Sequence, residues 1–386
     1  MNRLAVLAGD VVASDKAAGA GGLVLREGKI ERLLTPREEP PSGTPVLDFR
    51  PHLIAPGTID VHTHGAVERS FSSGPPEDTL DICRYRATTG ATGLLATITG
   101  EWDELLAALD KLGAIAGPVD GGATLLGIHI EGPFLNPARK GAIAVETMRP
   151  PLVDELRRMQ DAAHGQIRMM TVAPEVPGAL PVIEAMARLG IVPSIGHSDA
   201  TYEEALAGAE AGVRKSTHTY NAMRPLHHRD PGAVGAVLAD DRIVAELIAD
   251  GVHVAAGAMA VLLRAKGPRR VALVTDGVRY AGLADGVYER PGRGRLTVSD
   301  GAAVLDDGTI AGSVSPMNRN LRLLRDTLDV PIADLFTMAA AVPAVLLGLT
   351  GKGELKPGAD ADFAVYDDQL TCLATFIGGR QVYAQR

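Results

Sequence analysis

The sequence predicts a (β/α)8 barrel of the TIM type that carries a small β-sandwich built from both ends of the chain. Between about residues 56 and 276, short apolar runs alternate with stretches of helical period. Such alternation is typical of a parallel sheet wrapped in helices. The two chain ends contain short strand-like pieces and turns instead. A chain of 386 residues with 46% hydrophobic residues is large enough for both parts.

Eight apolar runs are expected to form the barrel strands. Each is short, is rich in Val, Ile or Thr, and ends in polar residues, as buried parallel strands do. They cover residues 58–62, 93–98, 125–130, 168–173, 191–197, 214–218, 244–250 and 271–276. The alternative, an open doubly wound sheet, needs a glycine-rich turn after its first strand. The glycines within residues 17–23 do not form a G-x-G-x-x-G pattern.

Helices are expected between these strands, because the intervening stretches are rich in Ala, Leu and Glu at helical spacing. The clearest cover residues 77–90, 101–117, 177–190, 201–213 and 254–267. Several end in glycine, a common helix terminator. We therefore expect residues 56–352 to form the barrel. Residues 1–55 and 353–386 are expected to form the sandwich, since chain termini often meet.

The bulk properties exclude several classes of function. A net charge of −9 argues against a nucleic-acid or anionic-membrane partner. No run approaches the roughly 18 apolar residues of a membrane span, and the first residues resemble a strand more than a signal peptide. The two cysteines, Cys83 and Cys372, form neither a C-x-x-C pair nor a disulfide framework. A reducing cytoplasmic location is expected.

Two histidines end the first predicted strand, in the sequence TIDVHTHG at residues 58–65. Residues i and i+2 of a strand share a face, so His62 and His64 point to one place. Adjacent buried imidazoles need partners, and a divalent metal would serve both. Surface histidines at a strand end are the alternative interpretation.

Four other predicted strands also end in polar residues of metal-ligand type: Glu131, His197, His218 and Asp276. The carboxyl ends of barrel strands meet at one rim, where the chemistry of such barrels is located. Imidazole and carboxylate groups are the ligands of zinc, and also of iron, manganese and cobalt. The sequence therefore predicts a divalent-metal site, with zinc as the first choice.

The number of metals is left open by the pattern. Glu131, His197 and His218 alone make a site with three ligands, and His62 with His64 could hold a second ion bridged by Glu131. In hydrolytic sites the metal activates water, and a carboxylate must move the proton. Asp276 is the candidate for that base. These roles predict a hydrolase of amide-like bonds.

The same residues stand in motifs that resemble a known family. These are HTHG at 62–65, HIEGPFLN at 129–136, IGHSDATYEEA at 195–205, THTYNAM at 217–223, DGVHV at 250–254, LVTDG at 273–277, AGS at 311–313 and GELKPGADADFAVYD at 353–367. In order and spacing they resemble the N-acetylglucosamine-6-phosphate deacetylases of the amidohydrolase superfamily. The resemblance implies metal-dependent hydrolysis of the acetamide of that amino sugar to glucosamine-6-phosphate and acetate.

The resemblance also implies roles for single residues. Glu131, His197 and His218 would hold the main metal, and Asp276 would act as general base and then general acid. The substrate contacts would be Ala142, Asn221, Ala222, His253, Ile310, Ala311 and Gly312. Arg229 would reach the phosphate in a neighbouring subunit, which implies a homodimer.

Some positions depart from the family pattern. Ile143 stands where the family commonly has a histidine that contacts the sugar, and the loop after Asn221 carries the additional His227 and His228. These departures leave open a deacetylase of a different N-acetyl amino sugar, phosphorylated or unphosphorylated, or of another N-acylated substrate.

Three further interpretations are less favoured. Cyclic-amide hydrolases usually bridge two metals with a modified lysine, whereas this chain has Glu131 at the corresponding strand end. An inactive metal-binding barrel has no need of Asp276. A serine hydrolase needs a G-x-S-x-G turn, and Ser198 lies in GHSDA.

Overall fold

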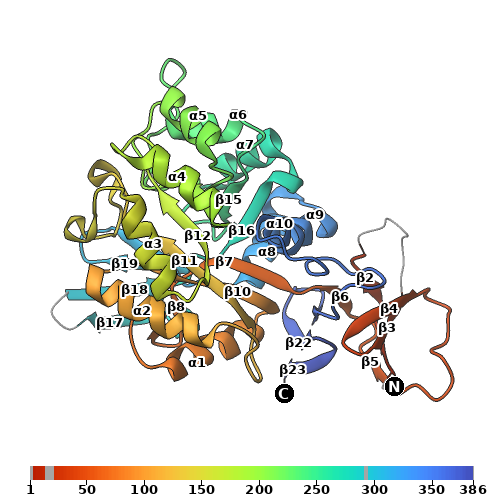
Figure 1. The fold of residues 1–386 in the computed structure, drawn as a ribbon. Helices are drawn as coiled ribbons and strands as arrows, with labels where there is room; N and C mark the ends of the chain where they lie inside the picture. The colour runs from red at the N-terminus through yellow and green to blue at the C-terminus, as the bar shows by residue number, and fades with distance from the viewer. Residues whose placement is uncertain (1–2, 14–20, 291–293, 386) are drawn as a thin grey trace.

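The computed structural model describes residues 3–13, 21–290 and 294–385. It contains a barrel wrapped in helices, with two further sheets at one side where both chain termini lie (Figure 1). Residues 17–20 of the glycine-rich stretch lie outside the described residues. Among the described residues, no helix is both long and apolar enough to cross a bilayer.

Eight parallel strands form the barrel, as the sequence predicts. They are β7 (Thr58–Thr63), β10 (Ala91–Ile98), β11 (Thr124–Glu131), β12 (Ile167–Val172), β13 (Val192–Ile195), β14 (Lys215–Ser216), β15 (Ala245–Ile248) and β16 (Val271–Val274). The first six pair in chain order, and β15 pairs with β16. Single parallel bridges at Lys215–Val244 and Thr63–Gly277 connect the two groups and close the ring.

Helices cover the outside of the barrel (Figure 1). They are α1 (Pro76–Ala87), α2 (Trp102–Ile115), α3 (Val153–Ala162), α4 (Ala179–Arg188), α5 (Tyr202–Ala211), α6 (Gly232–Ala239), α7 (Ala256–Lys266) and α8 (Met317–Leu328), followed by α9 (Ile332–Phe336), a π-helical turn at residues 337–341 and α10 (Val342–Leu346). All five helices expected individually are present, within a few residues of the predicted bounds.

An antiparallel sheet that the sequence reasoning did not anticipate follows β16. Its strands are β17 (Gly286–Arg290), β18 (Gly294–Ser299), β19 (Ala302–Leu305) and β20 (Ile310–Ser313). Leu296, Val298 and Ala303 form its small core. A parallel bridge from Ser313 to Gly277 fixes the last strand to the end of β16. The sheet thus brings the segment around Ile310 to the carboxyl-end rim of the barrel.

The chain termini form two more sheets. One has the order β4-β3-β1-β5, from β1 (Arg3–Leu7), β3 (Gly22–Arg26), β4 (Lys29–Leu34) and β5 (Val46–Asp48). The other has the order β2-β6-β21-β22-β23, from β2 (Asp10–Val11), β6 (Leu53–Pro56), β21 (Phe363–Tyr366), β22 (Cys372–Ile377) and β23 (Arg380–Ala384). Their shared core includes Val6, Leu23 and the stacked rings of Phe363 and Phe376, 4.5 Å apart.

Candidate metal centre and substrate cavity

The six residues expected as ligands or base meet at the carboxyl ends of five barrel strands. His62 lies within β7 and His64 directly after it, Glu131 ends β11, and the other three follow β13, β14 and β16 by two residues. They form two groups, and within each the potential ligand atoms lie within 4.8 Å of one another. The groups are Glu131, His197 and His218, and His62, His64 and Asp276.

The first group converges on one point. Glu131 Oε1 lies 3.0 Å from His197 Nε2 and 3.0 Å from His218 Nε2, and the two nitrogens are 3.2 Å apart. All three side chains are buried. Three donor atoms aimed at one buried point are the arrangement in which a divalent cation is bound, with room for further ligands.

The outer nitrogens of these two histidines support the same conclusion. His197 Nδ1 lies 2.9 Å from the Arg139 carbonyl, and His218 Nδ1 lies 3.1 Å from the Asn221 carbonyl. A carbonyl only accepts, so each Nδ1 carries the proton and each Nε2 keeps its lone pair. This tautomer is the one that metal-binding histidines adopt. The donor set therefore fits a divalent metal.

The second group lies beside the first and shares Glu131 with it. His62 Nε2 and His64 Nε2 are 3.3 Å apart, and each lies 3.3 Å from Asp276 Oδ1. Glu131 Oε2 lies 3.2 Å from His64 Nε2, while Oε1 faces the first group. The two oxygens of one carboxylate thus face the two groups, as a bridging ligand requires.

Three of these residues have an unusual backbone conformation. His197, His218 and Asp276 have φ angles of +47°, +31° and +48°. Left-handed conformations cost a non-glycine residue about 1 kcal/mol or more, and they concentrate at functional sites. Hydrogen bonds hold the strand ends in place, such as the 2.9 Å bond from Asp276 N to the His62 carbonyl.

Electrostatics keep the carboxylates of the centre ionised. Burial acts to raise the pKa of Glu131, but hydrogen bonds from His197, His218 and His64 outweigh it and lower that pKa. Burial likewise acts to raise the pKa of Asp276, which the charges of His62 and His64 lower instead. For His64, burial acts to lower the pKa, yet Asp276 and Glu131 raise it to about 10. The site thus favours positive charge.

A cavity of about 520 Å3 opens over this centre. Its lining contains all the substrate contacts implied by the resemblance except Arg229: Ala142, Asn221, Ala222, His253, Ile310, Ala311 and Gly312. The volume suits a small molecule. Ile143 is also part of the lining, so the departure at this position belongs to the cavity wall itself.

His253 is held by a buried carboxylate. Its Nδ1 lies 2.6 Å from Asp250 Oδ2, and Asp250 Oδ1 accepts hydrogen bonds from the backbone N–H groups of Val252 and His253. Burial acts to lower the pKa of His253, but the Asp250 carboxylate outweighs it and raises that pKa. The ring is therefore fixed at the cavity wall with its proton on Nδ1.

Arg229 lies apart from the cavity of its own chain. It is exposed in a loop closed by the backbone pairing of His227 with Asp230, and its Nη1 lies 2.8 Å from His228 Nε2. Leu226 in the same loop is 53% exposed. The loop therefore presents a cation and an apolar side chain to the outside of the molecule.

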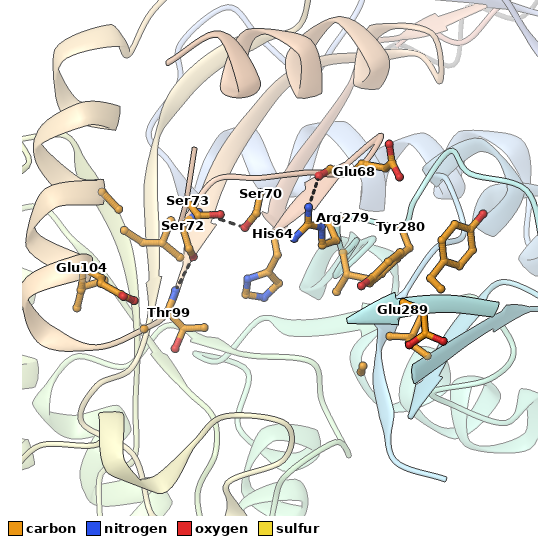
Figure 2. A pocket seen from close by; sticks show the side chains of 18 residues that line it. His64, Glu68, Ser70, Ser72, Ser73, Thr99, Glu104, Arg279, Tyr280 and Glu289 are labelled. Carbon is orange, nitrogen blue, oxygen red and sulfur yellow. Dashed lines mark hydrogen bonds between the residues drawn. The ribbon is translucent and has the colours of Figure 1, made fainter. Parts of the chain in front are cut away.

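A second cavity, of about 590 Å3, adjoins the first, with His64 part of both linings. Figure 2 shows Ser70, Ser72 and Thr99 on one side of His64 and Tyr280 on the other. The sequence reasoning missed this side chamber, because the serines follow the histidine motif in a loop without a pattern of its own.

The sequence reasoning also missed a charged pair beneath the centre, Lys215 in β14 and Glu246 in β15. Both side chains are fully buried, and they form an ion pair. Burial acts to raise the pKa of Glu246, but the charges of Lys215 and His62 lower it. A signal was present, since a glutamate interrupts the apolar run VAELIAD at residues 244–250.

Comparison with known proteins gives a consistent result. The model of the amidohydrolase family matches residues 53–382. The chain is 35% identical to the N-acetylglucosamine-6-phosphate deacetylase of Bacillus subtilis, over 97% of this chain and 96% of that protein. It is 33% identical to the N-acetylgalactosamine-6-phosphate deacetylase of Escherichia coli O157:H7, over 85% and 87%.

A solved structure extends the likeness to the fold. It is a mutant N-acetyl-D-glucosamine-6-phosphate deacetylase from Mycobacterium smegmatis in complex with N-acetyl-D-glucosamine-6-phosphate. The TM-score is 0.91 at 32% identity, over 99% of this chain and all of that one. Family model, relatives and fold agree over nearly the whole length. The chain therefore belongs to the amidohydrolase family and, within it, to the N-acetylglucosamine-6-phosphate deacetylase family.

Proposed function

We propose that this protein hydrolyses the acetamide of N-acetylglucosamine-6-phosphate and releases glucosamine-6-phosphate and acetate. The observation that carries the proposal is the position of Asp276. This ionised carboxylate lies among the imidazoles of two candidate metal groups and lines a cavity of about 520 Å3. The relatives of similar length named above are deacetylases of phosphorylated N-acetyl amino sugars.

Glu131, His197 and His218 would hold the principal metal, and His62 and His64 a second one with Glu131 as the bridge. Zinc is the first choice for these nitrogen and oxygen donors, which also suit iron, manganese and cobalt. When bound, a divalent metal polarises the acetamide carbonyl and lowers the pKa of the attacking water.

Asp276 performs the proton transfers in this proposal. Its carboxylate accepts a proton from the water that attacks the acetyl carbon. It then donates that proton to the sugar nitrogen as the carbon–nitrogen bond breaks, which frees the amine. The second proton of the water remains on the new carboxyl group and passes to solvent, so that acetate leaves. The lowered pKa of Asp276 supports its starting form, because a general base must be ionised before it can accept a proton.

The cavity wall would orient the sugar. His253, whose Nδ1 is bound to Asp250, would offer its Nε2 to a substrate oxygen near the reacting carbon. Asn221 and Ala222 would contact the phosphate end, while Ala142 and the segment Ile310 to Gly312 would confine the ring.

A second candidate is a deacetylase of a different N-acylated amino sugar, with or without a phosphate. It is favoured by Ile143, an apolar residue in the lining where the family commonly has a histidine. An apolar wall cannot hydrogen-bond a sugar hydroxyl, so it alters which sugars fit. The galactosamine enzyme among the relatives supports variation in the sugar.

The deciding experiment measures acetate release by metal-reconstituted protein. The substrates are N-acetylglucosamine-6-phosphate, N-acetylgalactosamine-6-phosphate and unphosphorylated N-acetylglucosamine, compared side by side. We expect the highest kcat/KM with N-acetylglucosamine-6-phosphate. Higher efficiency with either other sugar would favour the second candidate. Absence of acetate from all three, with metal bound, would contradict the first candidate and would indicate a different N-acylated substrate.

We also propose a homodimer in which Arg229 of one subunit reaches the phosphate in the other. An arginine fork matches a phosphate well, and Arg229 is exposed and outside its own cavity. A cytoplasmic location is proposed as well, supported by Cys83 and Cys372, both buried and free.

A further inference from the structure

A single buried carboxylate oxygen connects the two candidate metal groups. Glu246 Oε1 lies 2.7 Å from His62 Nδ1, and it also accepts a 2.8 Å hydrogen bond from the backbone N–H of His218. His62 belongs to the second group and His218 to the first. The other oxygen, Oε2, forms the ion pair with Lys215. Both Lys215 and Glu246 are fully buried, and neither lines the cavity.

Stability alone does not account for this arrangement. A buried ion pair gains little net free energy, because removing both charges from water costs about as much as their attraction returns. A well-packed apolar pair at the same positions would serve a barrel core equally well. Glu246 is fully buried in a strand that is otherwise apolar, AELI. The charge of Glu246 is therefore better explained by the contacts of Oε1 with His62 and His218.

The histidines of the barrel rim differ in their outer partners. His197 and His218 direct Nδ1 at neutral backbone carbonyls, whereas His62 directs Nδ1 at a carboxylate. Nearby His129, which belongs to neither metal group, lies between the hydroxyls of Thr97 and Thr171. A carboxylate on Nδ1 fixes the ring and makes the opposite nitrogen a stronger metal ligand.

We propose that Glu246 is a positioning residue that makes His62 a ligand of a second metal ion, with Lys215 as its counter-ion. The Lys215 ammonium allows the carboxylate to stay charged in the barrel core. Because the same oxygen holds the His218 backbone, the two metal positions share one rigid support. This inference rests on the metal site proposed above, but not on the identity of the substrate.

The test is a zinc titration of the chelator-stripped full-length chain by calorimetry, for the wild type and the double variant Lys215→Met/Glu246→Gln. The glutamine keeps an oxygen that can accept from His62 and His218, while both charges are removed. We expect two classes of zinc site in the wild type. In the variant the weaker class should lose about 10–100-fold in affinity, and the stronger class should change less than about threefold.

A second variant covers the case in which the first does not fold. Glu246→Asp keeps the charge and shortens the side chain by one methylene, so the carboxylate cannot reach His62 in the same way. Because His62 contacts Glu246 through its ring and His218 only through its backbone N–H, we expect a larger loss of zinc affinity at the weaker class than at the stronger class.

A matched control removes a comparable charged pair far from the site. Lys352 and Asp362 lie 2.5 Å apart beside the terminal sheets, and the Asp362 side chain is 4% exposed. Lys352→Met/Asp362→Asn should leave both zinc affinities unchanged.

Three results would overturn the inference: a single zinc per wild-type chain, equal loss at both classes in the Glu246 variants, or no loss at either. Acetate release is assayed separately, so a wrong substrate would not affect this result.

Discussion

At the scale of single residues, Asp276 meets two conditions that usually oppose each other. A base in a cavity must be desolvated enough to react and must still be ionised. Burial by itself favours the protonated carboxyl group, and the neighbouring His62 and His64 reverse that preference. The two neighbouring imidazoles thus lower the pKa of Asp276 against the effect of burial.

The substitution Asp276→Asn tests the role of this carboxylate. Asparagine has nearly the same shape but cannot accept the proton of the attacking water. We expect an unchanged metal content and a kcat lower by roughly 10^2–10^4-fold, the usual contribution of a general base. Metal analysis and acetate release measure the two quantities. A variant that retains wild-type kcat would exclude Asp276 from the proton transfers.

The substitution Asp250→Asn tests the support of His253. The asparagine oxygen can still accept the backbone N–H groups of Val252 and His253, but the charge facing Nδ1 is lost. Because Asp250 raises the pKa of His253 above 6.5 in the fold, the protonated pair stabilises the wild type fully below pH 6.5. That contribution declines as the pH rises through the folded-state pKa.

The measurement is the melting temperature of the metal-free chains between pH 6 and pH 9. The melting temperature of the wild type should exceed that of Asp250→Asn most near pH 6, and by less near pH 9. The pKa of Asp250 itself is lowered from 3.8, so protonation of Asp250 changes the stability only below pH 3.8, outside this range. An advantage independent of pH would mean that the pair does not titrate as argued.

At the scale of elements, the strand ends show how much the sequence could predict. The polar residues after the apolar runs could be assigned to one rim, because parallel barrel strands end on the same side. The contact between His62 and Glu246 could not, since these residues are 184 positions apart and no spacing rule connects them. The left-handed backbone at His197, His218 and Asp276 also left no sequence signal, as none of them is a glycine.

The sheet β17–β20 was missed for a different reason. Its strands are short, and two of them, β17 and β18, face solvent over much of their length, so no continuous apolar run identifies them. The motif at residues 311–313 indicated a pocket wall but not its architecture. The domain boundaries expected at residues 55 and 353 stay predictions.

The helix α5 offers an independent test at this scale. It begins five residues after His197, and its N-terminus has a capping box: Thr201 Oγ1 accepts from the Glu204 N–H, and Glu204 Oε2 accepts from the Thr201 N–H. Thr201→Ala should lower the free energy of unfolding by about 1 kcal/mol, as measured by urea denaturation. Thr201→Ser should restore most of it, and zinc content should be unchanged in both variants.

At the scale of the whole molecule, the proposed homodimer depends on the loop that contains Arg229. Among the described residues, no arginine lines the cavity of about 520 Å3, although an anionic substrate needs a counter-charge. The adjoining chamber is lined by Arg279. Arg229 is directed to the outside, together with exposed Leu226. In the proposed dimer, this loop of one subunit would bring its Arg229 to the phosphate in the other.

The substitution Arg229→Ala tests this arrangement. We expect KM for N-acetylglucosamine-6-phosphate to rise about 10–100-fold, since one charge-assisted contact contributes about 1.5–3 kcal/mol. The KM for the unphosphorylated sugar should stay the same. Light scattering checks that the dimer is intact, and Arg242→Ala, in a surface ion pair with Asp240 and Glu210, is the control. A monomeric wild type would contradict the shared site.

The pairing of β6 with β21 has a consequence for the order in which this chain can mature. On a ribosome β6 emerges roughly 300 residues before the strand that hydrogen-bonds to it, Ala55 opposite Ala364. The backbone groups on this side of β6 stay unpaired while the whole barrel is synthesised. During that time they can pair with a wrong strand. Only one residue separates β6 from β7, the strand of His62. The strand that carries His62 is therefore anchored to its neighbouring sheet only when the end of the chain has been made. A nascent chain stalled before residue 363 would present the unpaired β6 to chaperones.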